Sequence, residues 1–225
     1  MCFSPQASFI ASAFLGLVAI VSYIKLSRQK NNESRQRLSL VLVPLGFALQ
    51  QLSEGFVWLS LLHHYGSLAR NLSTTIFMFF AFIFWPAYIP ACLYQLESND
   101  IRKDVLRVFR LIGYLVAGLL LARMLYFGIQ AQLANCHIMY TSNLAELSWL
   151  VAALIMAGYL IATVGALLVS SVPGVRLLGI LIGGAYIVTY LFYINFLISV
   201  WCFFSALVSL LVYQLVLKNP ERHSI

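Results

Sequence analysis

Charged residues are scarce in this chain, and acidic ones most of all. Of its 225 residues only 9% are charged, with seven acidic and 14 basic side chains, whereas 62% are hydrophobic. A water-soluble domain carries about a quarter charged residues. The composition therefore excludes an ordinary cytosolic fold, a disordered chain and a disulfide-rich miniprotein, and it indicates a membrane protein.

Several cofactor signatures are also missing. None of the four histidines, His63, His64, His137 and His223, falls in the middle of an apolar run, which argues against a bis-histidine haem inside the protein. The last apolar run has no central lysine, since Lys218 is at its end, so a retinal Schiff base has no candidate residue. No phosphate-binding glycine loop is present, and the sequence leaves the cofactor unknown.

The sequence does contain apolar runs long enough to cross a bilayer. About 20 helical residues span the roughly 30 Å hydrocarbon layer, and seven such runs cover 8–25, 38–62, 73–96, 106–130, 147–170, 175–193 and 194–217. The connections are short, so we expect an all-α bundle of seven transmembrane helices forming one domain over residues 1–225. Because Tyr193 to Asn195 separates the last two runs only thinly, six spans with one long broken helix is the alternative.

The basic residues predict the orientation, because Lys and Arg near span ends stay in the cytoplasm. With seven spans, one face carries only Arg70. The other face carries twelve basic residues: Lys25, Arg28, Lys30, Arg35, Arg37, Arg102, Lys103, Arg107, Arg110, Arg176, Lys218 and Arg222. The N-terminus is therefore expected outside and the C-terminus inside. The net charge of +7 then reflects contact with anionic lipid headgroups, and no nucleic-acid partner is required.

Two formal charges lie well inside the predicted spans, Glu54 and Arg123. Counted from the outer ends of their spans, they lie about 12 Å and about 10 Å deep. An acid and a base at similar depth are expected to pair, because either one alone is costly in a bilayer. The pair is interpreted either as a purely structural ion pair or as part of a ligand cavity.

The surroundings of Glu54 favour a cavity. Gln50 and Gln51 lie one helical turn below Glu54 and Trp58 one turn above, on a shared face. The candidate ligand-binding residues are Glu54, Arg123, Gln50, Gln51, Trp58, Tyr126, Tyr190, Trp201 and Cys202. For the tyrosines, an interfacial aromatic belt is the alternative.

Two cysteines are expected outside the membrane, Cys2 and Cys136. In an oxidising compartment they predict a disulfide from the N-terminus to the loop after the fourth span. The weaker alternative is a metal site formed by Cys2, Cys136 and His137, since thiolate and imidazole suit zinc or copper. Cys136 and His137 are adjacent and lack the spacing of a ligand motif.

Several segments resemble a family of uncharacterised multi-pass bacterial membrane proteins whose chains begin MCFS. The segments are Met1–Ser4 with Ala7–Phe9, Gln50–Gly55 with Trp58, Cys136–Tyr140, Leu167–Ser171 and Ser199–Cys202. The resemblance implies a bacterial inner (plasma) membrane location. It also implies that Cys2, Glu54, Trp58, Cys136, Trp201 and Cys202 belong to one shared feature, whereas it implies no activity.

Three functions stay open. The first is binding of a small molecule in an outward-facing polar and aromatic pocket, for sensing or for transport. The second is an enzyme or a thiol or metal redox site at the outer face, using Cys2 or Cys202 with Glu54 and His137. The third is a structural subunit or assembly factor. The ligand, the oligomeric state and the choice among these functions do not follow from the sequence.

Overall fold

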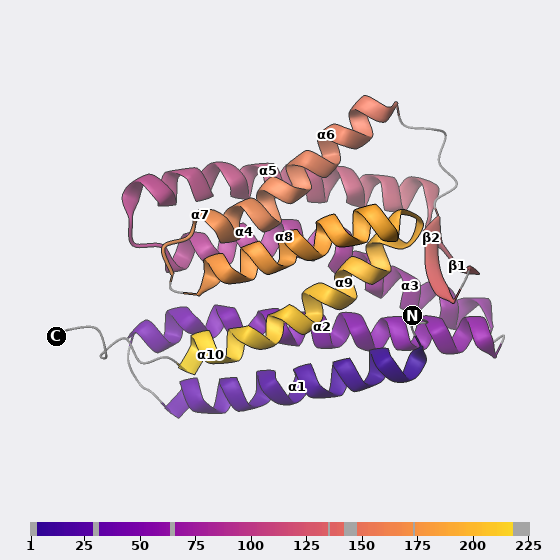
Figure 1. Ribbon diagram of the computed structural model, residues 1–225, viewed down its shortest axis with the longest axis horizontal. Helices are drawn as coiled ribbons and strands as arrows, with labels where there is room; N and C mark the ends of the chain where they lie inside the picture. The colour runs from indigo at the N-terminus through magenta and orange to yellow at the C-terminus, as the bar shows by residue number, and fades with distance from the viewer. Residues whose placement is uncertain are drawn as a thin grey trace.

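The computed structural model describes residues 4–28, 32–63, 66–134, 136–141, 148–172 and 174–217. Within these ranges, seven helices are long and apolar enough to cross a membrane, which confirms the predicted number of spans. The continuous ones are α1 (Pro5–Arg28), α2 (Asn32–Leu62), α5 (Asp100–Phe127) and α8 (Val175–Phe192). Figure 1 shows them running along the length of one bundle, with α1 beside α2.

The other three spans contain a change of helix type. The third consists of α3 (Ser67–Phe79), the π-helical η1 (Phe80–Phe84) and α4 (Trp85–Leu96). The fifth consists of α6 (Trp149–Leu160), the π-helical η2 (Ile161–Gly165) and α7 (Ala166–Val169). The seventh consists of the 3-10 turn η3 (Ile194–Phe196), α9 (Leu197–Val208), the 3-10 turn η4 (Ser209–Leu211) and α10 (Val212–Leu217).

The last two spans are separate helices. Tyr193 leaves helical geometry with φ −138° and ψ 36°, and the chain turns back through η3 so that α9 packs against α8. The alternative with six spans is therefore wrong.

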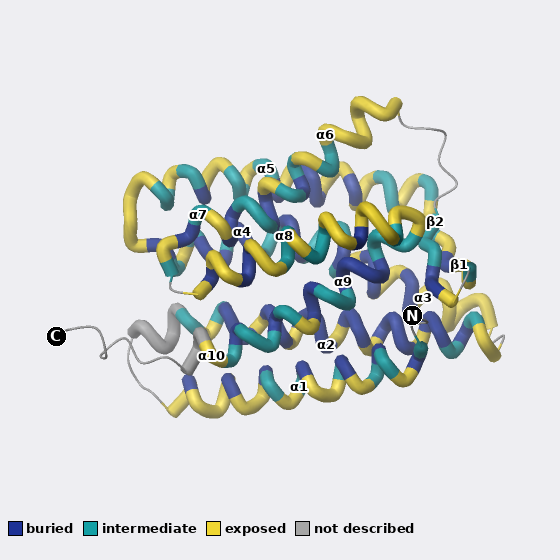
Figure 2. The backbone as a smooth tube through the Cα atoms, viewed as in Figure 1, coloured by how far each residue is buried: buried dark blue, intermediate teal, exposed yellow. Residues whose placement is uncertain are grey.

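Helix α2 is the central element of the bundle. In its most apolar stretch 72% of residues are buried inside the protein, compared with 22% in α5 and in α8. It packs against α1, α3, α4, α9 and α10. Figure 2 shows α2 largely buried, while α1 and α8 expose one side. Polar groups on α2 are therefore shielded from lipid by protein on several sides.

The π turn in the third span follows from a proline. Pro86 has no N–H and disfavours an ordinary helical turn before it. The Trp85 N–H donates to the Phe80 carbonyl, five residues back, so the Ala81 carbonyl loses the N–H donor that it would have in an α-helix. Nearby, Gly113 of α5 lies so close that a Cβ there would stand 2.0 Å from the Pro86 carbonyl oxygen.

A two-stranded hairpin follows α5, where the sequence predicted helix as far as residue 130. Gly128, with φ +68°, ends the helix, and β1 (Gln130–Ala134) pairs antiparallel with β2 (His137–Thr141). Ala131 and Ile138 pack on Val57 and Trp58 near the end of α2. The hairpin therefore covers one end of the bundle, which we call the hairpin end (Figure 1).

The opposite end carries the connections Glu97–Asn99 and Ser170–Gly174. Arg28, Arg102, Lys103 and Arg176 lie at or next to this end, so we call it the basic end.

Candidate functional site

Three polar side chains are buried together on α2. Gln50 and Gln51 are 0% exposed and Glu54 is 2% exposed, and their spacing places them on one helix face. Glu54 lies eight residues before the end of α2 at Leu62, about 12 Å along the axis. A polar group at such a depth is expensive and is a functional-site hypothesis by default.

Partners for these side chains come from two other helices. Ser199 of α9 donates a hydrogen bond to Glu54 Oε1 at 2.5 Å, and Gln51 Nε2 donates to Glu54 Oε2 at 3.2 Å. Trp85 of α4 donates from Nε1 to Gln50 Oε1 at 2.7 Å. We call these five residues the Glu54 cluster. It ties α2 to α4 and α9 near the centre of the bundle.

The Glu54 cluster is incompletely satisfied. Gln51 Oε1 has no hydrogen-bond partner among the described residues, and the same holds for the buried hydroxyl of Tyr140, whereas Gln50 Nε2 has only the weakly accepting Cys202 thiol beside it. A buried polar atom without a partner costs about 1–3 kcal/mol. Such atoms in a native protein therefore call for an additional partner, such as a water or a ligand.

A cavity of about 300 Å³ lies close to this cluster, although none of the five cluster residues lines it. Its walls come from η1, α5, β2, α6, η3 and α9. The lining residues are Ala81, Phe82, Leu120, Ile138, Tyr140, Ile155, Met156, Tyr159, Ile194, Asn195, Phe196, Leu197, Ile198, Trp201 and Cys202. Most of this wall is apolar, and its polar groups are few, which is typical of a small-molecule site.

Tyr140 and Cys202 connect the cavity to the cluster. Both line the cavity and both lie within electrostatic range of the Glu54 carboxylate. The Tyr140 ring is fixed by stacking on Phe77, with the ring centroids 4.8 Å apart. Burial, and then the nearby carboxylate, hold the pKa of Tyr140 well above its ordinary value. The hydroxyl is therefore protonated at neutral pH and available to donate a hydrogen bond.

Tyr159 on the opposite wall has a partner. Its hydroxyl donates to the Ala81 carbonyl at 2.6 Å, which is the carbonyl that the π turn before Pro86 deprives of its usual donor. The ring also meets Trp201 edge-on at 5.7 Å. Turns of π-helix occur often at functional sites, and this one borders the cavity.

A second, narrower cavity continues towards the basic end. It measures about 60 Å³ and shares Tyr159, Trp201 and Cys202 with the first. Ser205 and Ser209 of the seventh span also line it. Trp201 is held between the two spaces by a hydrogen bond from Nε1 to the Ile182 carbonyl at 3.1 Å.

The predicted ion pair between Glu54 and Arg123 is wrong. Glu54 accepts its hydrogen bonds from Ser199 and Gln51, and no ion pair joins it to Arg123 among the described residues. Arg123 instead lies in a cleft on the outside of α5. Depth along a helix fixes the height of a side chain, whereas the helix rotation decides which way it faces.

The remaining predicted ligand residues divide into three groups. Trp201 and Cys202 line the cavity. Trp58 is buried beneath the hairpin and is not part of the cavity wall. Tyr126 and Tyr190 are 83% and 49% exposed, so they lie on the outside of the bundle, as the aromatic-belt alternative expected.

Cys2 lies outside the described residues, so both the disulfide with Cys136 and the metal alternative stay predictions. His137 stacks on Phe196, with the ring centroids 4.7 Å apart. Within the described ranges, no group of three or more His, Cys, Asp or Glu side chains is placed to hold a metal ion.

Sequence reasoning missed four residues of this region, namely Trp85, Tyr140, Tyr159 and Ser199. Ser199 and Tyr140 lie in segments that carry the family resemblance, and that resemblance is the one sequence feature that could have pointed to them. Tyr159 gave none, because its partner Ala81 is 78 positions away in the chain.

A second buried carboxylate, Glu97, occupies the basic end and is 3% exposed. It accepts hydrogen bonds from the Ser171 N–H at 2.8 Å, from the Asn99 N–H at 3.1 Å and from the Ser171 hydroxyl. Burial alone would raise the pKa of Glu97, but the hydrogen bonds from Ser171 and Asn99, with nearby Arg102, together hold it below its ordinary value. Each carboxylate oxygen has a donor, so Glu97 has a structural role: it holds together the connection after α4 and the connection after α7.

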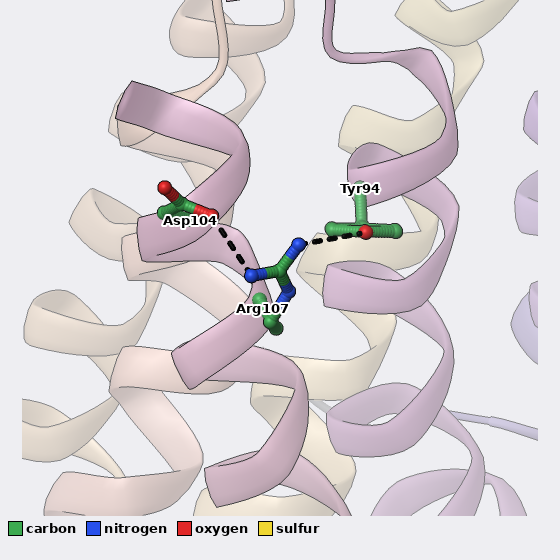
Figure 3. Close-up of polar contacts among 3 residues, drawn as sticks. All are labelled: Tyr94, Asp104 and Arg107. Atoms are coloured by element: carbon green, nitrogen blue, oxygen red, sulfur yellow. Dashed lines mark hydrogen bonds and ion pairs between the residues drawn. The ribbon is translucent and has the colours of Figure 1, made fainter. Parts of the chain in front are cut away.

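Next to Glu97, an exposed polar group joins the start of α5 to α4. Figure 3 shows Arg107 between Asp104, at 3.0 Å, and the Tyr94 hydroxyl, at 3.5 Å. The guanidinium of Arg110 also lies 4.3 Å from the Tyr94 ring centroid. Exposed ion pairs of this kind contribute about 0–1 kcal/mol, and they do not form a site.

Comparison with known proteins identifies the family. Residues 1–224 match the model of a family described as "Family of unknown function (DUF6629)", and the chain belongs to that family. No curated protein and no solved structure matches the chain.

Proposed function

We propose that this membrane protein binds a small molecule in the cavity beside the Glu54 cluster. The observation that carries the proposal is the cavity of about 300 Å³ whose wall includes the Tyr140 hydroxyl, a buried group without a partner among the described residues. A largely apolar molecule with one polar group fits this wall. Its apolar part would lie against Ile198 and Met156, and its polar group would accept the Tyr140 hydrogen bond.

The hairpin end is proposed to face outward. The distribution of Lys and Arg supports this orientation, because the basic end carries almost all of them. The hairpin side carries only Arg70 and, four residues before the end of α5, Arg123. The ligand would then be taken from the outer side or the outer leaflet. The family resemblance supports a bacterial inner membrane as the location.

The test is native mass spectrometry of the full chain purified from its own membrane in mild detergent. We expect a defined small-molecule adduct on the wild type, which lipid and metabolite extraction would identify. Glu54→Gln and Tyr140→Phe should reduce the retained adduct at least tenfold, the equivalent of about 1.4 kcal/mol of binding free energy.

The matched control is Tyr88→Phe. Tyr88 donates to the Ser39 carbonyl at 2.6 Å far from the cavity, so this variant loses a tyrosine hydroxyl and should retain the adduct. If the wild type carries no adduct, or if Glu54→Gln unfolds the protein while Tyr140→Phe binds normally, the Glu54 cluster serves only to fix helix packing. That result would support the structural-subunit alternative.

Transport is favoured over sensing by the second cavity. Two cavities lie end to end along the bundle and share Tyr159, Trp201 and Cys202, as expected of a pathway that is closed at one constriction. Trp201→Ala should open it. In that background, Ser209→Cys should react at least tenfold faster with an impermeant maleimide added from the hairpin side than in wild-type background. Trp201→Ala alone controls for the native cysteines, and an unchanged rate would contradict the pathway.

A further inference from the structure

A second cleft lies outside the bundle, between α5 and α6. The first two turns of α6 leave the bundle, and every residue from Ser148 to Leu154 is exposed. Figures 1 and 2 show this end of α6 tilted away from its neighbours. The cleft measures about 670 Å³ and is lined by Val116, Leu119, Ala122, Arg123, Tyr126, Phe127, Val151, Leu154 and Ile155. In a membrane protein, this space opens to the bilayer.

Arg123 is the one charged residue in this lining. It lies four residues before the end of α5 at Phe127, about 6 Å along the axis, which is close to the level of lipid headgroups. No hydrogen bond or ion pair reaches its guanidinium from the part of the chain that the structure describes. An arginine at this position needs an anion or water, because its charge is poorly tolerated in hydrocarbon.

The described acidic residues cannot supply that anion. Glu54 is bonded inside the bundle. Glu97, Asp100 and Asp104 lie at the opposite end of α5. The partner of Arg123 therefore comes from the surroundings or from an acidic residue whose side chain the structure does not describe. These residues are Glu33, at the start of α2 at the basic end, Glu146 in the segment before α6, and Glu221 near the end of the chain.

We propose that the cleft binds one anionic phospholipid of the leaflet at the hairpin end. Arg123 would donate charge-assisted hydrogen bonds to the lipid phosphate. One acyl chain would lie between α5 and α6, against Leu119, Leu154 and Ile155. The charge at the rim and the apolar walls below it match the two parts of such a lipid. This site is separate from the internal cavity, although Ile155 borders both.

The experiment uses the full chain in detergent, titrated with phosphatidylglycerol or phosphatidylcholine and examined by native mass spectrometry. We expect one phosphatidylglycerol to bind in preference to phosphatidylcholine, and Arg123→Gln to lower this preference at least tenfold. Arg123→Lys should bind at an intermediate level, because an ammonium keeps the charge and loses the bidentate geometry.

Two further variants separate the cleft from general surface charge. Arg70→Gln removes the other arginine on the hairpin side and should leave binding unchanged. Ala122→Phe narrows the cleft while keeping Arg123, and it should also weaken binding. Circular dichroism of each variant reports folding, and if Ala122→Phe misfolds, the two Arg123 variants decide the question.

Four results would overturn the proposal. The first is equal binding of both lipids to the wild type. The second is an equal loss of binding in Arg70→Gln and Arg123→Gln. The third is a lipid preference that emerges only in Glu146→Gln, because Arg123 would then be paired with Glu146. Phosphatidylglycerol binding that is abolished by an equal concentration of free glycerol phosphate would likewise assign the site to a soluble anion.

Discussion

Glu54 and Glu97 are buried to almost the same extent, 2% and 3% exposed, yet their surroundings differ in kind. Glu97 follows the last residue of α4, where the backbone N–H groups of Asn99 and Ser171 are not used by a helix and bind the carboxylate. Glu54 lies inside α2, where every nearby backbone N–H is already used by the helix. It depends on side-chain donors, Ser199 and Gln51.

This difference separates a structural group from a candidate site. At the basic end, each carboxylate oxygen of Glu97 has a hydrogen-bond donor. In the half of the bundle nearer the hairpin, Gln51 Oε1 and the Tyr140 hydroxyl have no partner among the described residues, and Tyr140 lines a cavity. For a contact that served only helix packing, apolar side chains of the same shape would be at least about as stable. The unused polar groups therefore favour a ligand.

The largest effect on stability is expected from Glu97→Ala. The variant leaves the Ser171 and Asn99 donors without their acceptor, and it should lower the free energy of unfolding by about 2–4 kcal/mol. Unfolding in mixed micelles measures this change. Asp104→Ala, which removes an exposed carboxylate of the Arg107 ion pair, is the matched control and should cost under about 1 kcal/mol. Equal losses in the two variants would mean that the buried hydrogen bonds of Glu97 contribute no more to stability than the exposed ion pair of Asp104.

The next effect in size is expected from Tyr159→Phe. This variant leaves the Ala81 carbonyl without its donor and should cost about 1–2 kcal/mol in the same assay. Phenylalanine keeps the contact with Trp201, so a change well above this range would mean that the π turn itself has rearranged. Far-UV circular dichroism and the tryptophan fluorescence of the variant would report such a rearrangement.

The sequence predicted the spans well because each one depends on local composition. Twenty apolar residues must cross the bilayer whatever their neighbours are, and even the thin separator at Tyr193 was sufficient to end a helix. The shared face of Gln50, Gln51 and Glu54 also followed from helical spacing alone.

Contacts between distant helices were predicted poorly. Arg123 and Glu54 have similar depths, but α5 is rotated so that Arg123 faces the cleft beside α6. The π turn at Phe80–Phe84 depends on Pro86 together with Tyr159, which comes from another span. The spacing of residues within one helix predicts neither the orientation of Arg123 nor the π turn, since both depend on how whole helices pack.

A smaller, pH-dependent effect should appear at Glu97. Its pKa is lowered in the folded protein, so its contribution to stability is complete above the ordinary value of about 4.5 and is lost as the pH falls through the lower folded value. Acid titration of the unfolding free energy should show this loss in the wild type. Glu97→Gln should lack it, because that side chain does not titrate, and an identical acid transition in both proteins would contradict the assignment.

The smallest stability change is expected from Tyr140→Phe, and this variant tests directly how Tyr140 differs from Tyr159. Tyr140 and Tyr159 line the same cavity, but only Tyr159 has a hydrogen-bond partner there among the described residues. Removing a buried hydroxyl without a partner should change the unfolding free energy by less than about 0.5 kcal/mol, or even stabilise the protein. The same variant should lose the retained ligand. A variant that is stable but empty would show that the Tyr140 hydroxyl contributes to binding and not to folding, whereas a loss of stability equal to that of Tyr159→Phe would mean that this hydroxyl already has a partner inside the protein.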